Sequence, residues 1–276
     1  MIVFPNCKIN LGLNVLRKRK DRFHELETVF YPLPLQDILE ITWLKRMTGE
    51  PGVPLSKSGL EIDSDNDNNL CIKAYWLLKK KFPQMPSIQM HLHKVIPSGG
   101  GLGGGSADAA FALMLLNEMC GLNLSKEQLL KFAMQLGSDC PFFIVNKPCF
   151  SKGRGELLEE IQLDLSAFKF IIVNSGLHVN TGAMFREIKP AVPAKSLKDI
   201  IQQPVSTWKD EMKNDFEKTV FALYPEIGHI KEELYQAGAA YASMSGSGST
   251  VYGLFSKDKP TELNFPSHYF VKELAR

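Results

Sequence analysis

A run of glycines is the feature of this sequence with the clearest chemical meaning. Six of the seven residues 99–105 are glycine, and Leu102 is the exception. Dense glycine weakens ordinary structure because each residue loses extra backbone entropy, but it lets backbone N–H groups approach an anion closely. A helix that begins directly after such a loop adds unpaired N–H donors and the positive end of its dipole. The pattern predicts a phosphate-binding loop.

The segments on either side of the run have the order that a phosphate loop needs. Residues 88–93 alternate apolar and polar side chains, which predicts a half-buried strand. An apolar helical stretch opens at Ser106, and Gly121 is its expected stop. The common P-loop is excluded, since no lysine follows the glycines. The run also satisfies the dinucleotide pattern G-x-G-x-x-G, but no acidic residue follows at a strand end. A nucleoside triphosphate is therefore favoured over a dinucleotide.

Two charged residues elsewhere suit the transfer of a phosphoryl group, which needs positioning and charge neutralisation. Asp139 lies between a helix stop and Pro141 and is the best candidate for the base that orients an acceptor hydroxyl. Lys8 lies within an apolar strand, where an unpaired charge is costly. From the pattern alone, a surface lysine explains Lys8 equally well. Asn10 points to the same strand face as Lys8 and could hydrogen-bond a substrate.

Three motifs of the sequence resemble those of the GHMP kinases, a superfamily that phosphorylates small molecules such as galactose, homoserine and mevalonate. Residues 97–110 resemble the central motif, P-x-x-x-G-L-G-x-S-S-A. Residues 5–11 resemble the first motif, P-A-K-x-N, and the small-residue loop 244–250 resembles the third. The three motifs span nearly the whole chain in the expected order, so together they are much more specific than any one of them.

Further segments resemble one branch of this superfamily, whose members phosphorylate 4-diphosphocytidyl-2-C-methyl-D-erythritol in non-mevalonate isoprenoid synthesis. Residues 21–25 are similar to its D-G-Y-H segment, and residues 136–143 to its L-G-x-D-x-P-F-F segment. Residues 214–217 and 224–227 are similar to its C-terminal half. The resemblance implies an ATP-dependent kinase acting on the 2-hydroxyl of that cytidine diphosphate-linked methylerythritol.

The sequence departs from this branch at three positions. Cys7 replaces the usual alanine, which exchanges one small side chain for another. Arg22 replaces a glycine, so the turn there is expected to do without a positive φ. Phe23 replaces a tyrosine, which keeps the aromatic ring and loses the hydroxyl.

The resemblance also implies roles for individual residues. Lys8 and Asp139 are implied to be catalytic, with the lysine keeping the carboxylate ionised and polarising the hydroxyl. The implied ATP-binding residues are Asn69, Lys94, Pro97, Gly99, Gly100, Gly101, Leu102, Gly103, Gly104, Gly105 and Ser106. The implied acceptor-binding residues are Asn10, Phe23, His24, Phe30, Thr181 and Phe185. The third-motif loop, expected to close the catalytic cleft, consists of Ser245, Gly246, Ser247, Gly248 and Ser249.

Residue chemistry supports some of these roles. The ring of Phe23 can stack on a pyrimidine, and His24 can hydrogen-bond its edge. Without the resemblance, a core phenylalanine beside a surface histidine would be the preferred interpretation. The expected cofactors are ATP and Mg²⁺, with the hydroxyl of Ser106 as a candidate magnesium ligand. Asp108, in the first turn of the same helix, is explained as well by the helix dipole as by a metal.

Composition restricts the partners of this chain of 276 residues. Apolar residues make up 44%, charged residues 22%, and the net charge is +2, so no basic field argues for nucleic acid. Five cysteines without a C-x-x-C pair argue for a reducing cytoplasm and against a disulfide framework or zinc site. No signal-like segment and no apolar run approaching ~20 residues is seen. We expect a small-molecule substrate, no nucleic acid or membrane partner, and a monomer or homodimer.

The expected fold class is α+β, as a two-domain GHMP kinase fold. The resemblance implies a ribosomal-protein-like α/β domain at residues 1–153 and a ferredoxin-like α/β domain at 154–276, with a seam at 152–155. Further strands are expected at residues 3–17, 28–30, 37–44, 142–145, 168–173, 241–243 and 250–255. Further helices are expected at residues 70–82, 125–136, 181–188, 209–223 and 226–238. A turn is expected at 48–54, and the acidic run 63–69 lacks the glycine and glutamate of an EF-hand.

Two other functions remain open at this point. One is another small-molecule kinase of the superfamily, of the homoserine or mevalonate type, against which His24 and the segment around Asp139 argue. The other is a nucleotide-binding module without catalysis that contacts RNA. The presence of both Lys8 and Asp139 favours the enzyme, and the near-neutral charge disfavours RNA.

Overall fold

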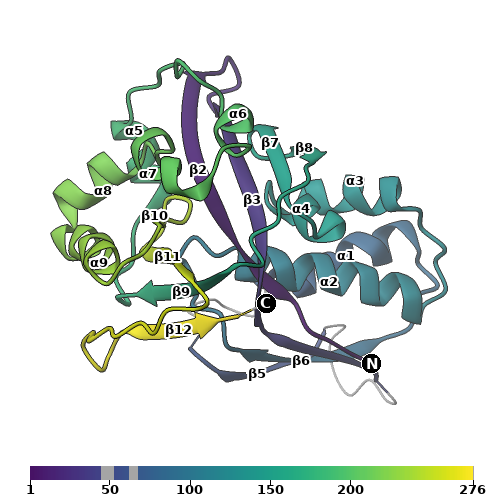
Figure 1. Ribbon diagram of the computed structural model, residues 1–276. Helices are drawn as coiled ribbons and strands as arrows, with labels where there is room; N and C mark the ends of the chain where they lie inside the picture. Colours follow the sequence, from purple (N-terminus) through teal and green to yellow (C-terminus); the bar gives the residue numbers. More distant parts are fainter. Residues whose placement is uncertain (45–52, 62–67, 276) are drawn as a thin grey trace. The chain divides into compact units, whose positions relative to one another are not determined.

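The computed structural model describes residues 1–44, 53–61 and 68–275 (Figure 1). Their strands form three four-stranded sheets. The strands are β1 (Ile2–Val3), β2 (Asn6–Lys18), β3 (His24–Gln36), β4 (Ile38–Trp43), β5 (Leu55–Gly59), β6 (Ile88–Lys94), β7 (Cys149–Gly153), β8 (Leu157–Glu160), β9 (Phe168–Asn174), β10 (Tyr241–Met244), β11 (Thr250–Ser256) and β12 (Phe270–Leu274). The helices are α1 (Leu70–Lys81), α2 (Gly104–Met119), α3 (Lys126–Leu136), α4 (Cys140–Val145), α5 (Thr181–Glu187), α6 (Leu197–Ile200), α7 (Val205–Glu211), α8 (Glu217–Leu223) and α9 (Pro225–Gln236).

The chain forms two compact units, each assembled from separate segments. The first unit comprises Met1–Cys7, Leu35–Ser98 and Gly103–Asn146. The second unit comprises Lys8–Pro34, Gly99–Leu102 and Lys147–Arg276. The chain therefore changes unit at both ends of the short stretch Gly99–Leu102, within the predicted phosphate loop.

The first unit is a sheet with helices packed on its apolar face. The strand order is β1-β4-β6-β5, with β4 antiparallel to β1 and β6, and β5 parallel to β6. Side chains of β6 alternate between buried and more exposed positions, as predicted, and Ile88, Met90 and Leu92 point into the core. Side chains of α1, α2 and α3 complete this core. Because successive side chains of a strand point to opposite faces, the apolar side chains of β6 all lie on the face that the helices cover.

Helix ends in the first unit follow the predicted capping chemistry. Asn69 caps α1, because its side chain accepts a hydrogen bond from the N–H of Cys71. Ser125 and Gln128 form the predicted capping box of α3, and the helix ends before Gly137 as expected. These side chains satisfy backbone groups that the helices leave unpaired, so they fix where the helices begin.

The second unit holds the other two sheets, β2-β3-β7-β8 and β10-β11-β9-β12. Figure 1 shows β2 and β3 as two long strands running side by side. Strand β9 pairs with β11 on one side and β12 on the other, and its inner residues are buried. Apolar side chains of α5, α8 and α9 pack with those of β9, β10 and β11 in one core. The predicted strands at 168–173, 241–243 and 250–255 and the helices at 181–188 and 226–238 are confirmed.

The strand predicted at residues 142–145 is wrong, because Cys140–Val145 form helix α4. Proline in the first turn suits a helix, since its φ is already helical and its missing N–H is not needed there. Pro141 takes that position in α4. Short apolar runs do not separate a strand from a buried helix by periodicity. Phe142 and Phe143 are fully buried in this helix.

Strand β3 is continuous, whereas the sequence predicts a break around Pro32 and Pro34. Its pairing with β7 runs from Leu26 to Phe30. The two prolines lie beyond this pairing, where a missing N–H removes no bond to β7. The single helix predicted at 209–223 is also wrong: α7 ends at Glu211 and α8 begins at Glu217.

The turn between β2 and β3 corrects another expectation. Arg22 has a φ of 69°, although the sequence predicts a turn without positive φ. Glycine adopts this left-handed region freely, whereas an arginine there is strained. Asp21 supports the turn by accepting hydrogen bonds from Arg19 and from the N–H of Phe23. The arginine therefore keeps the backbone form that suits a glycine.

The predicted seam at residues 152–155 covers the end of β7 and the start of the turn to β8, within the second unit. The chain enters that unit for the last time at Lys147. The boundary between consecutive domains at 153 and 154 stays a prediction. Strands β5, β7, β8 and β12 are not predicted from the sequence. Most of the predicted turn at 48–54 and of the acidic run at 63–69 lies outside the described residues.

Candidate active site

The glycine loop has the backbone geometry that its composition predicts. Gly99, Gly101 and Gly103 have φ values of 70°, 84° and 72°, in the left-handed region. Gly103 is the N-cap of α2, so the helix begins directly after it. Glycine alone adopts this region without strain. A loop with left-handed residues at alternate positions, ending in unpaired helical N–H groups, suits an anion.

The glycine loop and the third-motif loop touch through their backbones within the second unit. A Cβ atom on Gly101 would lie 1.9 Å from the carbonyl oxygen of Ser245. A Cβ on Gly248 would lie 2.3 Å from the carbonyl carbon of Gly100. The hydroxyl of Ser245 donates to the carbonyl oxygen of Gly101 at 2.9 Å. The glycine loop and the third-motif loop are thus packed backbone against backbone, and neither contact leaves room for a side chain.

Lys8 is a buried residue that lies against the glycine loop. Its side chain is 3% exposed, so the surface-lysine interpretation is wrong. Its Nζ donates to the Oδ1 of Asn10 at 2.6 Å and to the carbonyl oxygen of Gly101 at 2.9 Å. The Nζ also lies 5.2 Å from the ring centre of Phe30. The amide of Asn10 in turn donates to Thr28, which fixes the carbonyl that holds the lysine.

Asp139 belongs to the first unit and immediately precedes α4. It occupies the N-cap position, but its side chain does not cap the helix. Ser106, in the first turn of α2, lies near the same segment, since a Cβ on Gly137 would be 4.0 Å from its Oγ. Burial raises the pKa of the Cys140 thiol to about 12, against a hydrogen bond from Ser106 that lowers it. Cys140 is therefore a thiol at neutral pH and no nucleophile.

A buried ionic cluster lies below the start of α2. Lys94 forms ion pairs with Asp37 and, at 2.9 Å, with Asp108. Burial alone would lower the pKa of Lys94, but the charges of Asp108 and Asp37 outweigh it and raise that pKa. Burial and the nearby charge of Asp37 raise the pKa of Asp108 to about 7, although Lys94 opposes them. Asp108 is thus an ion-pair partner of Lys94, and the ATP-binding role of Lys94 stays a prediction.

The residues expected to bind the acceptor include an aromatic group in the second unit. The ring of His24 stacks on that of Phe185, with centres 5.1 Å apart and planes 19° apart. Phe23 is 52% exposed, and the guanidinium of Arg154 lies 4.6 Å from its ring centre. Burial, and then the charge of Lys18, lower the pKa of His24 below its usual value. His24 is therefore neutral at neutral pH, with one ring nitrogen donating and one accepting.

The structure assigns the predicted site residues to both units. The first unit holds Asn69, Lys94, Pro97, Gly103, Gly104, Gly105, Ser106 and Asp139. The second unit holds Lys8, Asn10, Phe23, His24, Phe30, Gly99, Gly100, Gly101, Leu102, Thr181, Phe185 and the loop Ser245–Ser249. Within the second unit, Thr181 also meets the third-motif loop, its hydroxyl 2.9 Å from that of Ser247. The pairing of Lys8 with Asp139 joins different units and stays a prediction.

Sequence reasoning missed two contributors to this site. Arg154, whose guanidinium lies over the ring of Phe23, has no predicted role beyond the seam. Asn214, which holds the third-motif loop, was noted only for its resemblance to the branch. No local pattern marks Asn214, because the sequence predicts one helix over residues 209–223; only the structure shows that it lies between α7 and α8.

No group of three metal-binding side chains of the His, Cys, Asp and Glu types occurs among the described residues. In the described part of the chain, no helix is both long and apolar enough to span a membrane.

Comparisons with known proteins define the class. Residues 69–147 match the GHMP kinases N terminal domain, and residues 196–263 match the GHMP kinases C terminal domain. The chain belongs to the GHMP kinase family and has its two-domain fold of mixed helices and sheets. The matched ranges lie on either side of the predicted domain boundary.

Two similar relatives from different organisms share one name. The chain is 52% identical over 270 residues to the 4-diphosphocytidyl-2-C-methyl-D-erythritol kinase of Bacteroides fragilis, covering 98% of this chain and 97% of the relative. It is 50% identical over 274 residues to the kinase of that name from Azobacteroides pseudotrichonymphae, covering 98% and 100%. The chain is thus a small-molecule kinase of this family.

Solved structures of kinases have the same fold as this chain. A crystal structure of 4-(cytidine 5'-diphospho)-2C-methyl-D-erythritol kinase matches with a TM-score of 0.79 at 27% identity and covers all of both chains. A homoserine kinase from Cytophaga hutchinsonii matches with a TM-score of 0.63 at 17% identity, over 92% of this chain and 86% of the other. The second likeness shows the fold alone.

Proposed function

We propose that this kinase transfers the γ-phosphoryl group of ATP to the 2-hydroxyl of 4-diphosphocytidyl-2-C-methyl-D-erythritol, giving the 2-phosphate and ADP. Membership of a kinase family implies the use of ATP. The observation that carries the acceptor is the aromatic group of the second unit. A neutral His24 stacked on Phe185, beside an exposed Phe23, suits a pyrimidine base. The names of the relatives, at about half identity over the whole chain, support the same acceptor.

In this proposal Asp139 and Lys8 act on the acceptor hydroxyl. The hydroxyl oxygen attacks the γ-phosphorus, the bond from that phosphorus to the bridging oxygen of ADP breaks, and the hydroxyl proton passes to Asp139. Lys8, held by Asn10 and the Gly101 carbonyl, supplies positive charge beside the transferred group. Positioning and charge neutralisation are the main requirements of phosphoryl transfer.

The glycine loop and the first turn of α2 are proposed to hold the triphosphate through backbone N–H groups. Mg²⁺ prefers oxygen ligands and keeps several waters. The hydroxyl of Ser106 near the segment of Asp139 fits that preference, whereas Asp108 is occupied by Lys94. Bound Mg²⁺ neutralises charge on the phosphates. The residue proposed to hold it is Ser106.

A coupled ADP-release assay with several acceptors tests the proposal. The full cytidine acceptor should be phosphorylated, whereas methylerythritol 4-phosphate, homoserine and mevalonate should not. Equal use of methylerythritol 4-phosphate would contradict cytidine recognition. Turnover of homoserine or mevalonate would support the other kinase types, and binding of ATP without turnover of any acceptor would support a non-catalytic module.

Substitutions of Phe23 and His24 test how the cytosine base of the acceptor is recognised. Phe23→Ala should lose about 1–3 kcal/mol of acceptor binding, the usual value of a base–aromatic stack. Phe23→Tyr is the matched control and should change little, because the stacking face is kept. His24→Ala should raise the acceptor KM and leave the KM for ATP unchanged. A parallel rise in both KM values would show a general disturbance of the site.

The setting of the enzyme is also proposed. All five cysteines are free thiols, which supports a reducing cytoplasm. We propose a monomer or homodimer that acts on a small molecule and needs neither nucleic acid nor a membrane.

A further inference from the structure

The segment between α7 and α8 runs beside β2 like a short extra strand. The N–H of Leu13 donates to the carbonyl oxygen of Lys213, and the N–H of Asp215 donates to that of Leu13, both at 2.9 Å. The carboxylate of Asp215 accepts a hydrogen bond from the N–H of Val15 at 2.7 Å. These contacts fix the backbone around Asn214, which is buried at 3% exposure.

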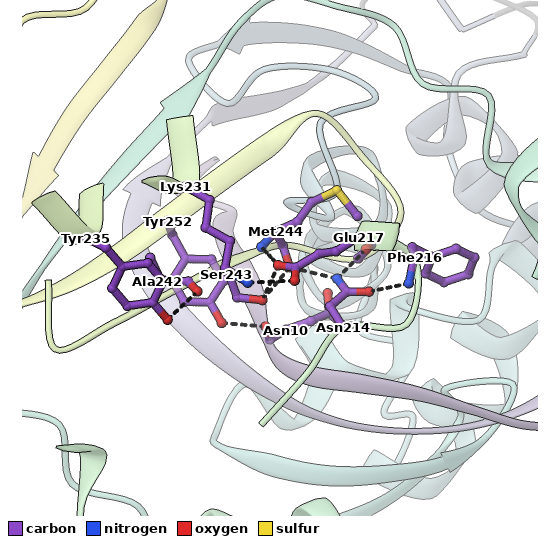
Figure 2. A network of polar contacts seen from close by, with 11 residues as sticks. Asn10, Asn214, Phe216, Glu217, Lys231, Tyr235, Ala242, Ser243, Met244 and Tyr252 are labelled. Carbon is purple, nitrogen blue, oxygen red and sulfur yellow. Dashed lines mark hydrogen bonds and ion pairs between the residues drawn. The ribbon is translucent and has the colours of Figure 1, made fainter. Parts of the chain in front are cut away.

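The side chain of Asn214 uses its whole amide on nearby backbone, as Figure 2 shows. Its Nδ2 donates to the carbonyl oxygens of Met244 and Gly246, both at 2.8 Å. Its Oδ1 accepts from the N–H of Phe216 at 3.0 Å. The two carbonyls lie on either side of Ser245, so one amide holds the entry of the third-motif loop.

Glu217, the first residue of α8, supports the same stretch. Its Oε1 accepts from the N–H of Met244 and from the hydroxyl of Ser243, both at 2.9 Å (Figure 2). Its Oε2 accepts from Lys231 of α9 at 2.6 Å. The side chain of Glu217 is 12% exposed, and Lys231 compensates its charge. The end of β10 is therefore tied to two helices.

The stretch that Asn214 holds also touches the glycine loop. The hydroxyl of Ser245 donates to the carbonyl oxygen of Gly101, which also accepts from Lys8. The described residues contain no cis peptide, so each peptide N–H points opposite to the preceding carbonyl. With the Gly246 carbonyl directed at Asn214, the N–H of Ser247 is directed away from it.

We propose that Asn214, supported by Glu217, is a positioning residue for phosphoryl transfer. It fixes the third-motif loop so that the Ser247 N–H keeps one direction, as a donor to a phosphate oxygen. It also keeps the Gly101 carbonyl where it holds Lys8. Asn214 acts through Ser245 and Gly101 and touches no substrate. The inference rests on the proposed function only in placing phosphate at this loop, and it is independent of which acceptor is used.

The isosteric variant Asn214→Asp tests this role. It places a carboxylate oxygen against the carbonyl oxygens of Met244 and Gly246. Two hydrogen bonds to the third-motif loop are thereby replaced by repulsion. We expect kcat to fall roughly 10- to 100-fold, less than the ~10²–10³ typical for removing a direct donor. Affinity for MgATP, measured by calorimetry, should fall as well, whereas binding of CDP alone should not change.

Asn117→Ala is the matched control. That asparagine also bridges loop backbone, through both the N–H and the carbonyl of Leu124, but near the C-terminal end of α2, whereas the glycine loop leads into the other end of this helix. It should lower the melting temperature and leave kcat unchanged. Glu217→Gln, which keeps an acceptor for Met244 and Ser243, should retain more activity than Glu217→Ala.

Wild-type kcat and MgATP affinity in folded Asn214→Asp would overturn the inference. So would a loss in Asn117→Ala equal to that in Asn214→Asp at the same melting temperature, because the role would then be structural. If the wild type uses an acceptor other than the cytidine compound, the proposed function fails, and the same comparison with that acceptor still decides the inference. If it uses none, MgATP affinity decides it.

Discussion

At the scale of single residues, the two buried lysines show two ways of keeping a cation inside a protein. Lys94 lies between two carboxylates, which compensate its charge within the cluster. Lys8 donates to an amide oxygen and a backbone carbonyl, which order its position against the glycine loop. The first arrangement suits a structural cluster, whereas the second suits a residue that meets phosphate.

Asp139→Asn should nearly abolish turnover and leave the fold intact, because the amide cannot accept the hydroxyl proton. Loss of a general base typically costs ~10²–10⁴ in rate. Lys8→Met should lower kcat more than it weakens ATP binding. Steady-state kinetics, with circular dichroism as the control for folding, checks both. A folded Asp139→Asn with the kcat of the wild type would remove Asp139 from the mechanism.

The buried cluster makes stability depend on pH. The pKa of Asp108 is about 7 in the folded protein, above its ordinary value of 3.8. Between these values the folded state holds a proton that the unfolded chain releases, so Asp108 lowers stability as pH rises from about 4 to about 7. Asp108→Asn should remove this loss, since its side chain is neutral at every pH and keeps an acceptor for Lys94.

Urea unfolding at pH 5 and pH 8 measures the effect. The Asp108→Asn variant should gain stability relative to the wild type on going from pH 5 to pH 8. An unchanged difference between the two proteins would contradict the raised pKa. Asp37→Asn is the contrasting variant and should destabilise at both pH values, because keeping its Oδ1 on the N–H groups of Val95 and Ile96 turns the amide nitrogen toward the ammonium group of Lys94.

At the scale of elements, the backbone packing of the two glycine-rich loops dominates the site. Gly101→Ala should strongly destabilise this region, because its Cβ would overlap the Ser245 carbonyl and its φ of 84° is unfavourable for alanine. Gly105→Ala is the control, since a Cβ there meets nothing within 4 Å. Alanine at this helical position should add about 0.5–1 kcal/mol of stability. Thermal unfolding compares the two, and equal melting temperatures would contradict this packing.

Elements with local signals could be predicted from the sequence, and elements decided by pairing could not. The capping box of Ser125 and Gln128 and the alternation in β6 depend on neighbouring residues alone. The continuity of β3 depends on where β7 stops pairing, more than 100 residues later in the chain. The split between α7 and α8 depends on Leu13 of β2, which pairs with Asn214.

In the candidate site, too, features with local signals could be predicted and features that depend on distant residues could not. Glycine at positions with positive φ follows from composition, as at Gly99 and Gly103. The burial of Lys8 and its bond to the Gly101 carbonyl join residues far apart in the sequence, and pattern alone left Lys8 undecided. The order of the three motifs implies a catalytic role for Lys8, which the local pattern alone does not.

At the scale of the whole molecule, ligand binding should stabilise the folded chain by mass action. MgATP at about 100 times its Kd should add about 2.7 kcal/mol, whereas NAD at the same concentration should add nothing. For a protein of this size the melting temperature should rise by roughly 5–10 °C with MgATP. Differential scanning fluorimetry measures both ligands, and an equal shift with NAD would contradict a triphosphate site.

The segmented composition of the two units has a consequence for synthesis on the ribosome. All residues of the first unit have been synthesised once Asn146 has left the ribosome. The second unit, in contrast, includes segments from Lys8 to the end of the chain. Strand β2, with ten of its thirteen residues buried in the finished protein, must wait for α8 and α9 to cover it. Exposed apolar strands of nascent chains are prone to aggregate. During translation, the apolar strand that carries Lys8 thus stays uncovered until the last third of the chain has been made.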